Sequence, residues 1–310
     1  MILHGSFSGI YPIVKDGQAS RTAGYVALFR AIESSRPASH RLFEDPFAKR
    51  FLDRRLALLA EACRVPGVAE LVSRYIDGRW AGARSSAVAR TRFIDDAIAA
   101  SLDRGIEQLV ILGSGFDSRA YRLSGLSELD VFEVDHPDTL GKKRALIEGL
   151  SHAIPPKLRF VEVDFRSDDL PAAMAGAGYS EHISTFILWE GVTNYLTESA
   201  VDATLRWCAR AAPGSQVLFT YIDRAVLDDP GSFAGTEDLF EVLEAAGESW
   251  TFGLDPSELG SFLHRRGLEL DRDVGSSEYR ALYMPAIARL MRGYGFYRIA
   301  MAHVPDHAQP

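Results

Sequence analysis

The sequence predicts an α/β fold built on a doubly wound, mostly parallel β-sheet. Five short segments are apolar and rich in β-branched and aromatic residues, which is typical of strands that are buried on both faces. The intervals between them are long enough to hold helices, so the chain alternates between strand and helix as a parallel sheet requires. These segments are residues 108–112, 131–134, 159–163, 184–188 and 216–221.

A helical pattern precedes these strands. Between residues 22 and 100, apolar residues recur at helical spacing, and the pattern breaks near Pro37, Pro46 and Pro66. We therefore expect a helical N-terminal cap over residues 1–104 and a sheet domain over residues 105–310. An acidic stretch at residues 228–248 predicts a helical insertion, a lid segment of about residues 222–254. Residues 268–270 and 296–303 predict two more strands, the last one antiparallel.

Composition and charge exclude several classes of protein. The 310 residues are 47% hydrophobic, which is enough for a sizeable core, and their net charge of −8 opposes nucleic-acid binding. Cys63 and Cys208 lack the spacing of a zinc site, so no metal is expected. Residues 1–20 lack a signal-peptide pattern, and no stretch approaches 18 consecutive apolar residues. We expect a soluble, cytoplasmic protein with no membrane or nucleic-acid partner, and the sequence leaves its oligomeric state open.

A glycine-rich turn follows the first predicted strand. Gly113 and Gly115 lie between this strand and a predicted helix, where a backbone without Cβ atoms can approach a ligand closely. The third glycine of the dinucleotide-binding fingerprint is replaced by Ser118. This favours a nucleoside ligand without a diphosphate over NAD, although the same glycines also suit a merely tight strand-to-helix turn.

Acidic residues follow three more of the predicted strands. Asp135, Asp164 and Glu190 each stand where a strand ends, and the carboxyl edge of a parallel sheet is where such folds bind ligands. Asp135 is placed to accept ribose hydroxyl groups, and Asp164 with Phe165 is suited to an adenine amine and ring face. The alternatives are a helix cap for Asp135 and solvated loop positions for the other two acids.

Seven segments that contain these residues resemble, in order, the leucine carboxyl methyltransferase-like family of class I S-adenosylmethionine (SAM) methyltransferases, which includes polyketide O-methyltransferases. The segments ARTRFIDD (residues 89–96) and EGVTNYL (residues 190–196) are the most specific, since neither belongs to a general nucleotide-binding fold. The resemblance implies a seven-stranded Rossmann-like sheet. The matching segments are residues 30–33, 45–48, 89–96, 112–119, 132–137, 163–165 and 189–196.

The resemblance also implies a cofactor, SAM, and a role for each motif residue. Arg90 would hold the SAM carboxylate, and Glu190 would lie beside the cofactor. The remaining cofactor contacts would come from Gly113 and Gly115 at the methionine moiety, Asp135 at the ribose, and Asp164 with Phe165 around the adenine. A guanidinium also suits this role by its chemistry, because its planar fork binds a carboxylate with two hydrogen bonds. An ion pair of Arg90 with Asp95 or Asp96 is the alternative.

The expected reaction is methyl transfer to a carboxylate or acidic hydroxyl of a small or medium-sized molecule, such as a polyketide or another secondary metabolite. No histidine occupies a motif position as a base, which favours an acceptor that ionises unaided. We expect Trp189, Asn194 and Tyr195 to line the floor of the acceptor pocket, with Asn194 and Tyr195 as the residues that act on the acceptor. The alternatives are methylation of a peptide or protein C-terminus, an NAD-dependent oxidoreductase, and a descendant that only binds its ligand. An aromatic cover is expected from Tyr25, Phe29, Trp80, Phe233 and Trp250.

Overall fold

The computed structural model describes residues 21–149, 154–234, 236, 239–241, 243, 249–291 and 293–306. Its centre is a seven-stranded sheet in the order β3-β2-β1-β4-β5-β7-β6. Residues 1–20, for which no signal-peptide pattern was found, lie outside the described residues. The strands are β1 (Gln108–Leu112), β2 (Asp130–Asp135), β3 (Leu158–Glu162), β4 (Thr185–Trp189), β5 (Gln216–Ile222), β6 (Glu269–Gly275) and β7 (Tyr297–His303).

Strand direction confirms the predicted class of fold. The first five strands are parallel, and β7 runs antiparallel to both β5 and β6. From β1 the chain proceeds to β2 and β3 on one side, and then to β4 and β5 on the other. The neighbouring strands β1 and β4 therefore flank the point where the strand order reverses, and ligands of open α/β sheets bind outside the carboxyl ends of such strands.

Two of the predicted strands differ from the expectation. The sixth strand is longer than residues 268–270, because it pairs along β7 through a register shift between Leu270 and Arg272. The last strand does not follow a short hairpin. Helices α12 (Ser276–Tyr283) and α13 (Pro285–Leu290) lie between β6 and β7, and α12 packs on α4 (Ala83–Asp103).

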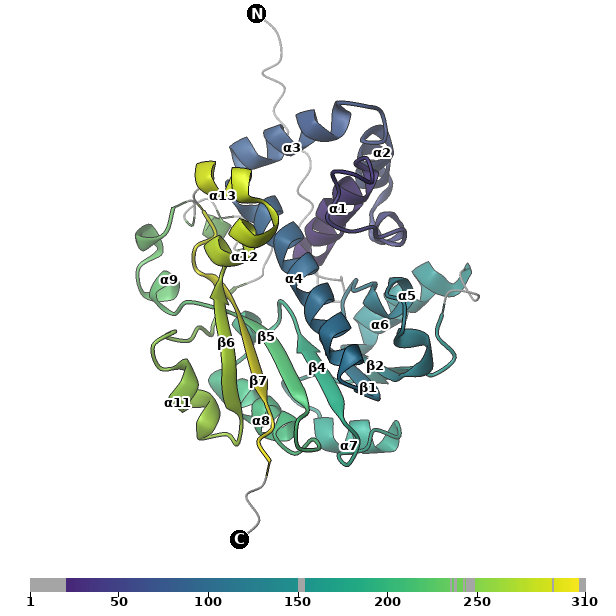
Figure 1. Ribbon diagram of the computed structural model, residues 1–310, viewed down its shortest axis with the longest axis vertical. Coiled ribbons are helices and arrows are strands. Elements are labelled where there is room, and N and C mark those ends of the chain that lie inside the picture. The colour runs from purple at the N-terminus through teal and green to yellow at the C-terminus, as the bar shows by residue number, and fades with distance from the viewer. Residues whose placement is uncertain are drawn as a thin grey trace, which may run out of the picture.

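Both faces of the sheet are covered, as the apolar strands predict. Alternate residues of β1 point to opposite faces: Leu109 and Ile111 belong to the core that includes α4, whereas Val110 and Leu112 belong to the core on the other face. The second face is covered by helices α7 (Leu170–Gly176), α8 (Glu198–Cys208) and α11 (Leu259–His264). The doubly wound arrangement is visible in Figure 1, where α4 crosses in front of the strands.

The N-terminal cap consists of three helices that precede α4: α1 (Arg21–Ser35), α2 (Arg54–Ala62) and α3 (Val68–Arg79). Helix α1 ends just before Pro37, and the Asp53 side chain caps α2 by accepting hydrogen bonds from two backbone N–H groups. Figure 1 shows these helices above the sheet, with α4 leading from them to the strands. The cap and the sheet share one apolar core, since residues of α1 and α4 pack with residues of β1 and β4.

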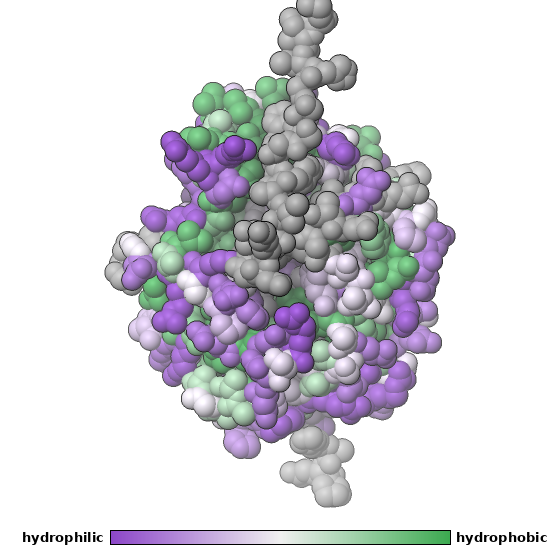
Figure 2. Space-filling view, turned by 180° about the vertical axis from the view of Figure 1, so that it is seen from behind, coloured by the Kyte–Doolittle hydropathy of each residue, from purple (hydrophilic) through white to green (hydrophobic). Residues whose placement is uncertain are grey.

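The remaining elements are short. Helices α5 (Arg119–Arg122) and α6 (Pro137–Ile147) follow β1 and β2, and α9 (Ala225–Asp228) follows β5. In the expected insertion, residues 239–241 and 243 are helical. No helix in the described part of the chain is long and apolar enough to cross a membrane. Figure 2 shows hydrophobic groups among hydrophilic ones on one face of the molecule, at the top and elsewhere. The cap helices expose three large side chains, Leu58, Leu71 and Tyr75.

Candidate functional site

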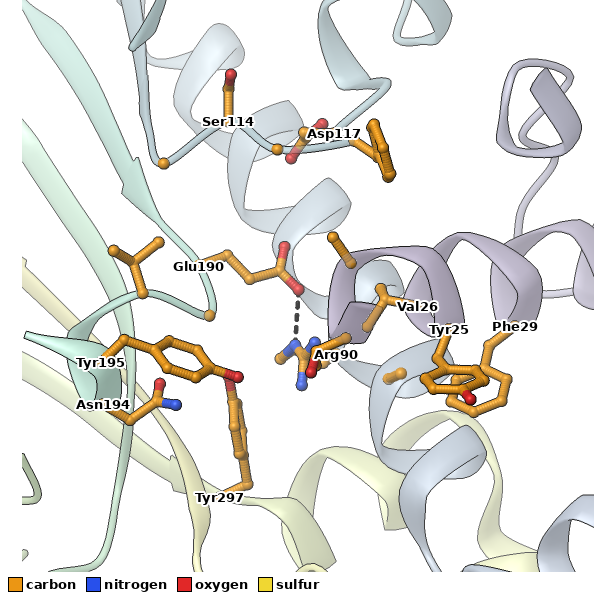
Figure 3. Close-up of a pocket in the computed structure, with 18 of the residues that line it drawn as sticks. Tyr25, Val26, Phe29, Arg90, Ser114, Asp117, Glu190, Asn194, Tyr195 and Tyr297 are labelled. Carbon is orange, nitrogen blue, oxygen red and sulfur yellow. Dashed lines mark hydrogen bonds and ion pairs between the residues drawn. The ribbon is translucent and has the colours of Figure 1, made fainter. Parts of the chain in front are cut away.

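A cavity of about 360 Å³ opens at the carboxyl ends of β1 and β4, the position that the strand order predicts. Its volume lies within the range of small-molecule sites. One half is formed by the glycine turn, with the acids that follow the strands; the other half is formed by aromatic residues of the cap and the C-terminal part. Figure 3 shows Arg90 and Glu190 between these halves.

The glycine turn is shaped by contacts that require glycine. Gly113 has a φ of 63°, and a Cβ atom there would lie 2.2 Å from a methyl group of Val192. Gly115 has a φ of 41°, a conformation that favours glycine, and a Cβ atom there would be in ordinary contact with the Gly113 carbonyl oxygen at 3.8 Å and the Ala23 Cβ at 4.0 Å. The turn after β1 thus packs directly on the loop after β4, and Gly115 lines the cavity beside this contact.

Asp135 lies at the end of β2 and faces this turn. Its carboxylate accepts hydrogen bonds from the backbone N–H groups of Gly115 (2.6 Å) and His136 (2.7 Å). Burial raises the pKa of the Asp135 carboxyl, against the opposing effect of these two hydrogen bonds. The carboxylate is therefore fixed in the cavity wall, where the sequence motif predicts it.

Arg90 projects from α4 into the cavity and pairs with Glu190. Its Nε atom donates to Glu190 Oε1 at 2.7 Å, and its guanidinium carbon lies 4.6 Å from the centre of the Tyr297 ring. Burial alone would lower the pKa of Arg90, but Tyr297 and Glu190 hold it above its usual value. Arg90 therefore remains a cation inside the cavity, and its partner is not Asp95 or Asp96.

Glu190 is shared with a second buried arginine that sequence reasoning did not single out. Arg119 is 1% exposed and donates to Glu190 at 2.8 Å, to Asp95 at 2.8 Å and to Asp117. Burial would raise the pKa of Glu190, but Arg119 and Arg90 lower it, so this carboxylate is ionised. Burial would raise the pKa of Asp117, but Arg119, Lys143 and Arg30 together lower it to about 2.

These ion pairs continue into the cap. Asp95 also accepts two hydrogen bonds from Arg122, and Ser118 donates to Asp45 at 2.6 Å. Asp45 in turn pairs with Arg30 of α1 at 3.0 Å. Most of these charged residues lie within the segments that carry the family resemblance, so the sequence motifs contain them. Only the fold shows which acid pairs with which arginine. The same contacts explain Ser118: its hydroxyl fixes Asp45, a role that a third fingerprint glycine could not perform.

Aromatic side chains line the other half of the cavity. Four of the five predicted cover residues are in its wall: Tyr25, Phe29, Trp80 and Trp250. The prediction for Phe233 is wrong, because this ring packs edge-on against Phe296 instead, with centroids 5.8 Å apart. Trp189 also lies outside the lining, since it is fully buried in the core beneath the sheet edge. Tyr294 and Tyr297, which no motif indicated, complete the wall.

Of the two residues predicted to contact adenine, Asp164 and Phe165, only Phe165 lines the cavity. Phe165 lines the cavity, with its ring centre 6.4 Å from that of Trp189. Asp164 is not in the lining: its carboxylate accepts hydrogen bonds from Arg166 at 3.1 and 3.2 Å, and Arg166 lowers its pKa. The local reason is a turn after β3, in which the N–H groups of residues 167 and 168 bond to the Asp164 carbonyl oxygen.

The two residues predicted to act on the acceptor lie together in a short 3₁₀ helix, η4 (Thr193–Tyr195), and both line the cavity. Asn194 is 2% exposed, and its backbone carbonyl accepts the N–H of Thr251 at 2.8 Å. Its side-chain Oδ1 is buried and has no hydrogen-bond partner among the described residues. Figure 3 shows Asn194 beside the Tyr195 and Tyr297 rings.

The residues present fit a SAM molecule. The cavity borders the turn at Gly115, and the buried Ser114 hydroxyl in its lining has no hydrogen-bond partner among the described residues. A fixed carboxylate, a buried guanidinium and an aromatic ring stand around that space at Asp135, Arg90 and Phe165. These groups match a ribose, a carboxylate and an adenine face respectively.

A parallel sheet with an antiparallel seventh strand, and a cavity at its switch point, are the features of the class I SAM-dependent methyltransferase fold. Comparison with known proteins agrees. The leucine carboxyl methyltransferase family model matches residues 23–209, and the chain belongs to this family. The family and the cofactor class predicted from the sequence motifs are thereby confirmed.

Curated relatives carry the same description. A Mycolicibacterium vanbaalenii protein named as a SAM-dependent methyltransferase is 34% identical over 261 residues, which is 77% of each chain. A Mycobacterium bovis protein of the same name is 37% identical over 205 residues, which is 63% of this chain and only 62% of that protein. A solved structure from Thermobifida fusca named as a methyltransferase has a TM-score of 0.58 at 18% identity, covering 94% of this chain and 97% of its own. This last likeness concerns the fold alone.

Proposed function

We propose that this protein transfers a methyl group from SAM to an oxygen atom, a carboxylate or an acidic hydroxyl, of a small or medium-sized molecule. Polyketides and other secondary metabolites are the candidate acceptors. The observation that carries the proposal is that Arg90, Gly115 and Asp135 line the same cavity as an aromatic wall. When bound, SAM supplies a methyl group that is activated by its sulfonium.

Each residue of the first half has a task in binding. Arg90 would bind the SAM carboxylate with the guanidinium nitrogens that Glu190 does not use, and Asp135 would accept the ribose hydroxyl groups. Phe165 would cover one face of the adenine. Asp164 would have to turn away from Arg166 to reach an adenine amine.

The second half would position the acceptor. The aromatic cover excludes water from the reacting oxygen, and much of the lowering of the barrier can come from alignment alone. The Asn194 amide would orient the acceptor oxygen, and the neighbouring Tyr195 would contact it. A reaction of this kind needs no metal and no partner other than the small molecule.

Calorimetric titration of the purified protein with SAM and, separately, with NAD tests the cofactor. We expect SAM to bind and NAD to fail, since Ser118 is committed to Asp45. Replacing Asp135 by alanine should weaken SAM binding by about 1–3 kcal/mol, the cost of lost hydrogen bonds to a charged group. Asp138→Ala is the matched control, because this nearby acid is exposed and lies outside the cavity lining. Equal affinity in the two variants would contradict the role of Asp135.

Transfer itself is tested with labelled SAM against panels of small acids, phenolic polyketides and peptide C-termini. We expect label in a small molecule. Label only in peptides would favour the alternative of a C-terminal carboxyl methyltransferase.

A further inference from the structure

Arg90, the residue expected to bind the SAM carboxylate, is held by two different groups. Its Nε atom donates to Glu190 at 2.7 Å, and its guanidinium carbon lies over the ring of Tyr297, 4.6 Å from the ring centre. Figure 3 shows Glu190 and Tyr297 on different sides of this guanidinium. Glu190 belongs to the loop after β4, and Tyr297 is the first residue of β7. The antiparallel strand therefore also contributes to the cofactor half of the cavity.

The two groups that hold Arg90 are connected through one hydroxyl. Thr220, a fully buried residue of β5, has its Oγ1 atom 3.2 Å from the hydroxyl oxygen of Tyr297. The same atom accepts the backbone N–H of Gly191, the neighbour of Glu190, at 2.7 Å. Tyr297 itself is only 6% exposed. The ring and the carboxylate are therefore fixed relative to each other.

A ring and an acid hold a guanidinium by different means. A carboxylate neutralises the cation and accepts its N–H groups, whereas the π-electrons of a ring attract the cation without adding negative charge. Among the residues that the structure describes, Glu190 is the only acid paired with Arg90, and Glu190 is shared with Arg119. A second acid in the place of Tyr297 would compete with the carboxylate of SAM for Arg90, but a ring does not.

We propose that Tyr297 is a positioning residue for cofactor binding, whose ring holds the guanidinium of Arg90 in the orientation that binds the carboxylate of SAM. This inference rests on the part of the proposed function that places this carboxylate at Arg90. It requires that the ring of Tyr297, and not its hydroxyl group, sets the affinity for a ligand that carries the carboxylate. A ligand that lacks the carboxylate should not depend on the ring.

The test uses two ligands that differ in the group that Arg90 would bind. S-Adenosylhomocysteine carries the amino-acid carboxylate, and 5′-methylthioadenosine has the same nucleoside and sulfur without it. Both are titrated at pH 7 by calorimetry into the wild type and into Tyr297→Phe, Tyr297→Leu and Tyr297→Met. The first variant keeps a ring, and the other two have apolar side chains without one. Scanning calorimetry selects the variants that are folded, and two ringless side chains of different shape are available for the comparison.

We expect the ringless variants to bind S-adenosylhomocysteine about tenfold more weakly than the wild type, because a cation–π contact in a largely buried site contributes about this much. Their affinity for 5′-methylthioadenosine should stay within about twofold. Tyr297→Phe should stay within about threefold for both ligands, since a phenyl ring also attracts a cation. Equal losses for the two ligands would indicate a general structural role and overturn the assignment. A Tyr297→Phe variant as weak as Tyr297→Leu would overturn it too.

A double variant gives an independent result with S-adenosylhomocysteine alone. In an Arg90→Met background there is no cation for the ring to hold, so adding Tyr297→Leu should weaken binding by no more than about a further twofold. A further tenfold loss in that background would contradict the inference.

Phe233→Leu is the matched control for packing. The Phe233 ring belongs to the same apolar cluster as Tyr297, where it packs against Phe296, but it lies outside the cavity lining. The affinity of this variant for S-adenosylhomocysteine should stay within about twofold. A tenfold loss here would mean that any ring of the cluster has the same effect, against a specific role of Tyr297.

The outcomes distinguish this inference from the proposed function. Failure of S-adenosylhomocysteine to bind the wild type would overturn the proposed function, and wild-type affinity in Arg90→Met would overturn the role that it gives to Arg90. Binding that depends on Arg90 but not on the ring of Tyr297 would overturn the inference alone.

Discussion

Arg119 is the residue whose loss should be most visible in the stability of the protein. It is 1% exposed and serves three carboxylates, those of Asp95, Asp117 and Glu190. In Arg119→Met the side chain still fills the space, but Asp117 loses its arginine partner and the other two acids lose one of theirs. Removing one partner of a buried ion pair costs about 3–5 kcal/mol, because the remaining charge stays buried.

The size of the effect follows from the chain length. An unfolding entropy of about 2 cal/mol/K per residue over 310 residues means that 1 kcal/mol corresponds to about 1.5 °C in Tm. The melting temperature of Arg119→Met should therefore fall by about 5–8 °C in differential scanning calorimetry at pH 7. Affinity for SAM should fall as well, since Glu190 then pairs with Arg90 alone.

Two control variants make this result interpretable. Arg119→Lys keeps the charge but cannot reach three carboxylates with one ammonium, so its Tm should lie between those of the wild type and Arg119→Met. Arg166→Met removes an arginine that is 70% exposed, and its Tm should change by about 1 °C or less. A Tm of Arg119→Met as high as that of Arg166→Met would refute the reasoning that the buried charges depend on Arg119.

Three further predictions concern the same edge of the sheet. Arg90→Lys should weaken SAM binding about tenfold or more in calorimetry, because the forked contact is lost although the charge remains; normal affinity with slow turnover would contradict the assigned role. Gly113→Ala should abolish SAM binding and lower the Tm, since its Cβ would collide with the facing loop, whereas Gly178→Ala, at a φ of 86° in open space, should cause only the smaller backbone strain. The pKa of Asp117, lowered from 3.8 to about 2, predicts about 2 kcal/mol of stability that is present above pH 4 and lost as the pH falls toward 2. Asp117→Asn should therefore flatten the dependence of the unfolding free energy on pH in this window, as urea titrations would measure.

The elements most accessible from the sequence are those whose signal is local. Strand β1 matches residues 108–112 because a short apolar run rich in β-branched residues and bounded by turn residues is typical of a buried strand. Strand β6 was underestimated because Arg272 and Asp273 interrupt its apolar pattern. These residues extend the strand by pairing with β7, and Asp273 is held by Arg298. Long-range pairing of this kind leaves no mark on the local pattern.

The same distinction applies to the site. Gly113, Gly115 and Asp135 could be placed in the cavity wall from their positions after strands, since the carboxyl edge of the sheet fixes where such residues go. Tyr294 and Tyr297 could not, because they reach the cavity only through the antiparallel return of the chain after α13. Tyr294 adopts a φ of 56°, which is unusual for a residue with a Cβ atom and carries no sequence signature.

The chain of ion pairs between the cap and the sheet edge limits how this protein can be divided or recombined. Residues 105–310 alone would retain Arg119 and Arg122 but lose Asp95 and Asp45, the acids that neutralise them from the N-terminal side. A shortened form of this kind should not yield a minimal cofactor-binding unit. Exchange of N-terminal halves between relatives should succeed only where the acids at positions 45 and 95 are transferred into a chain that carries matching arginines. The part of the chain that can be exchanged as one unit is therefore the cap together with the glycine turn.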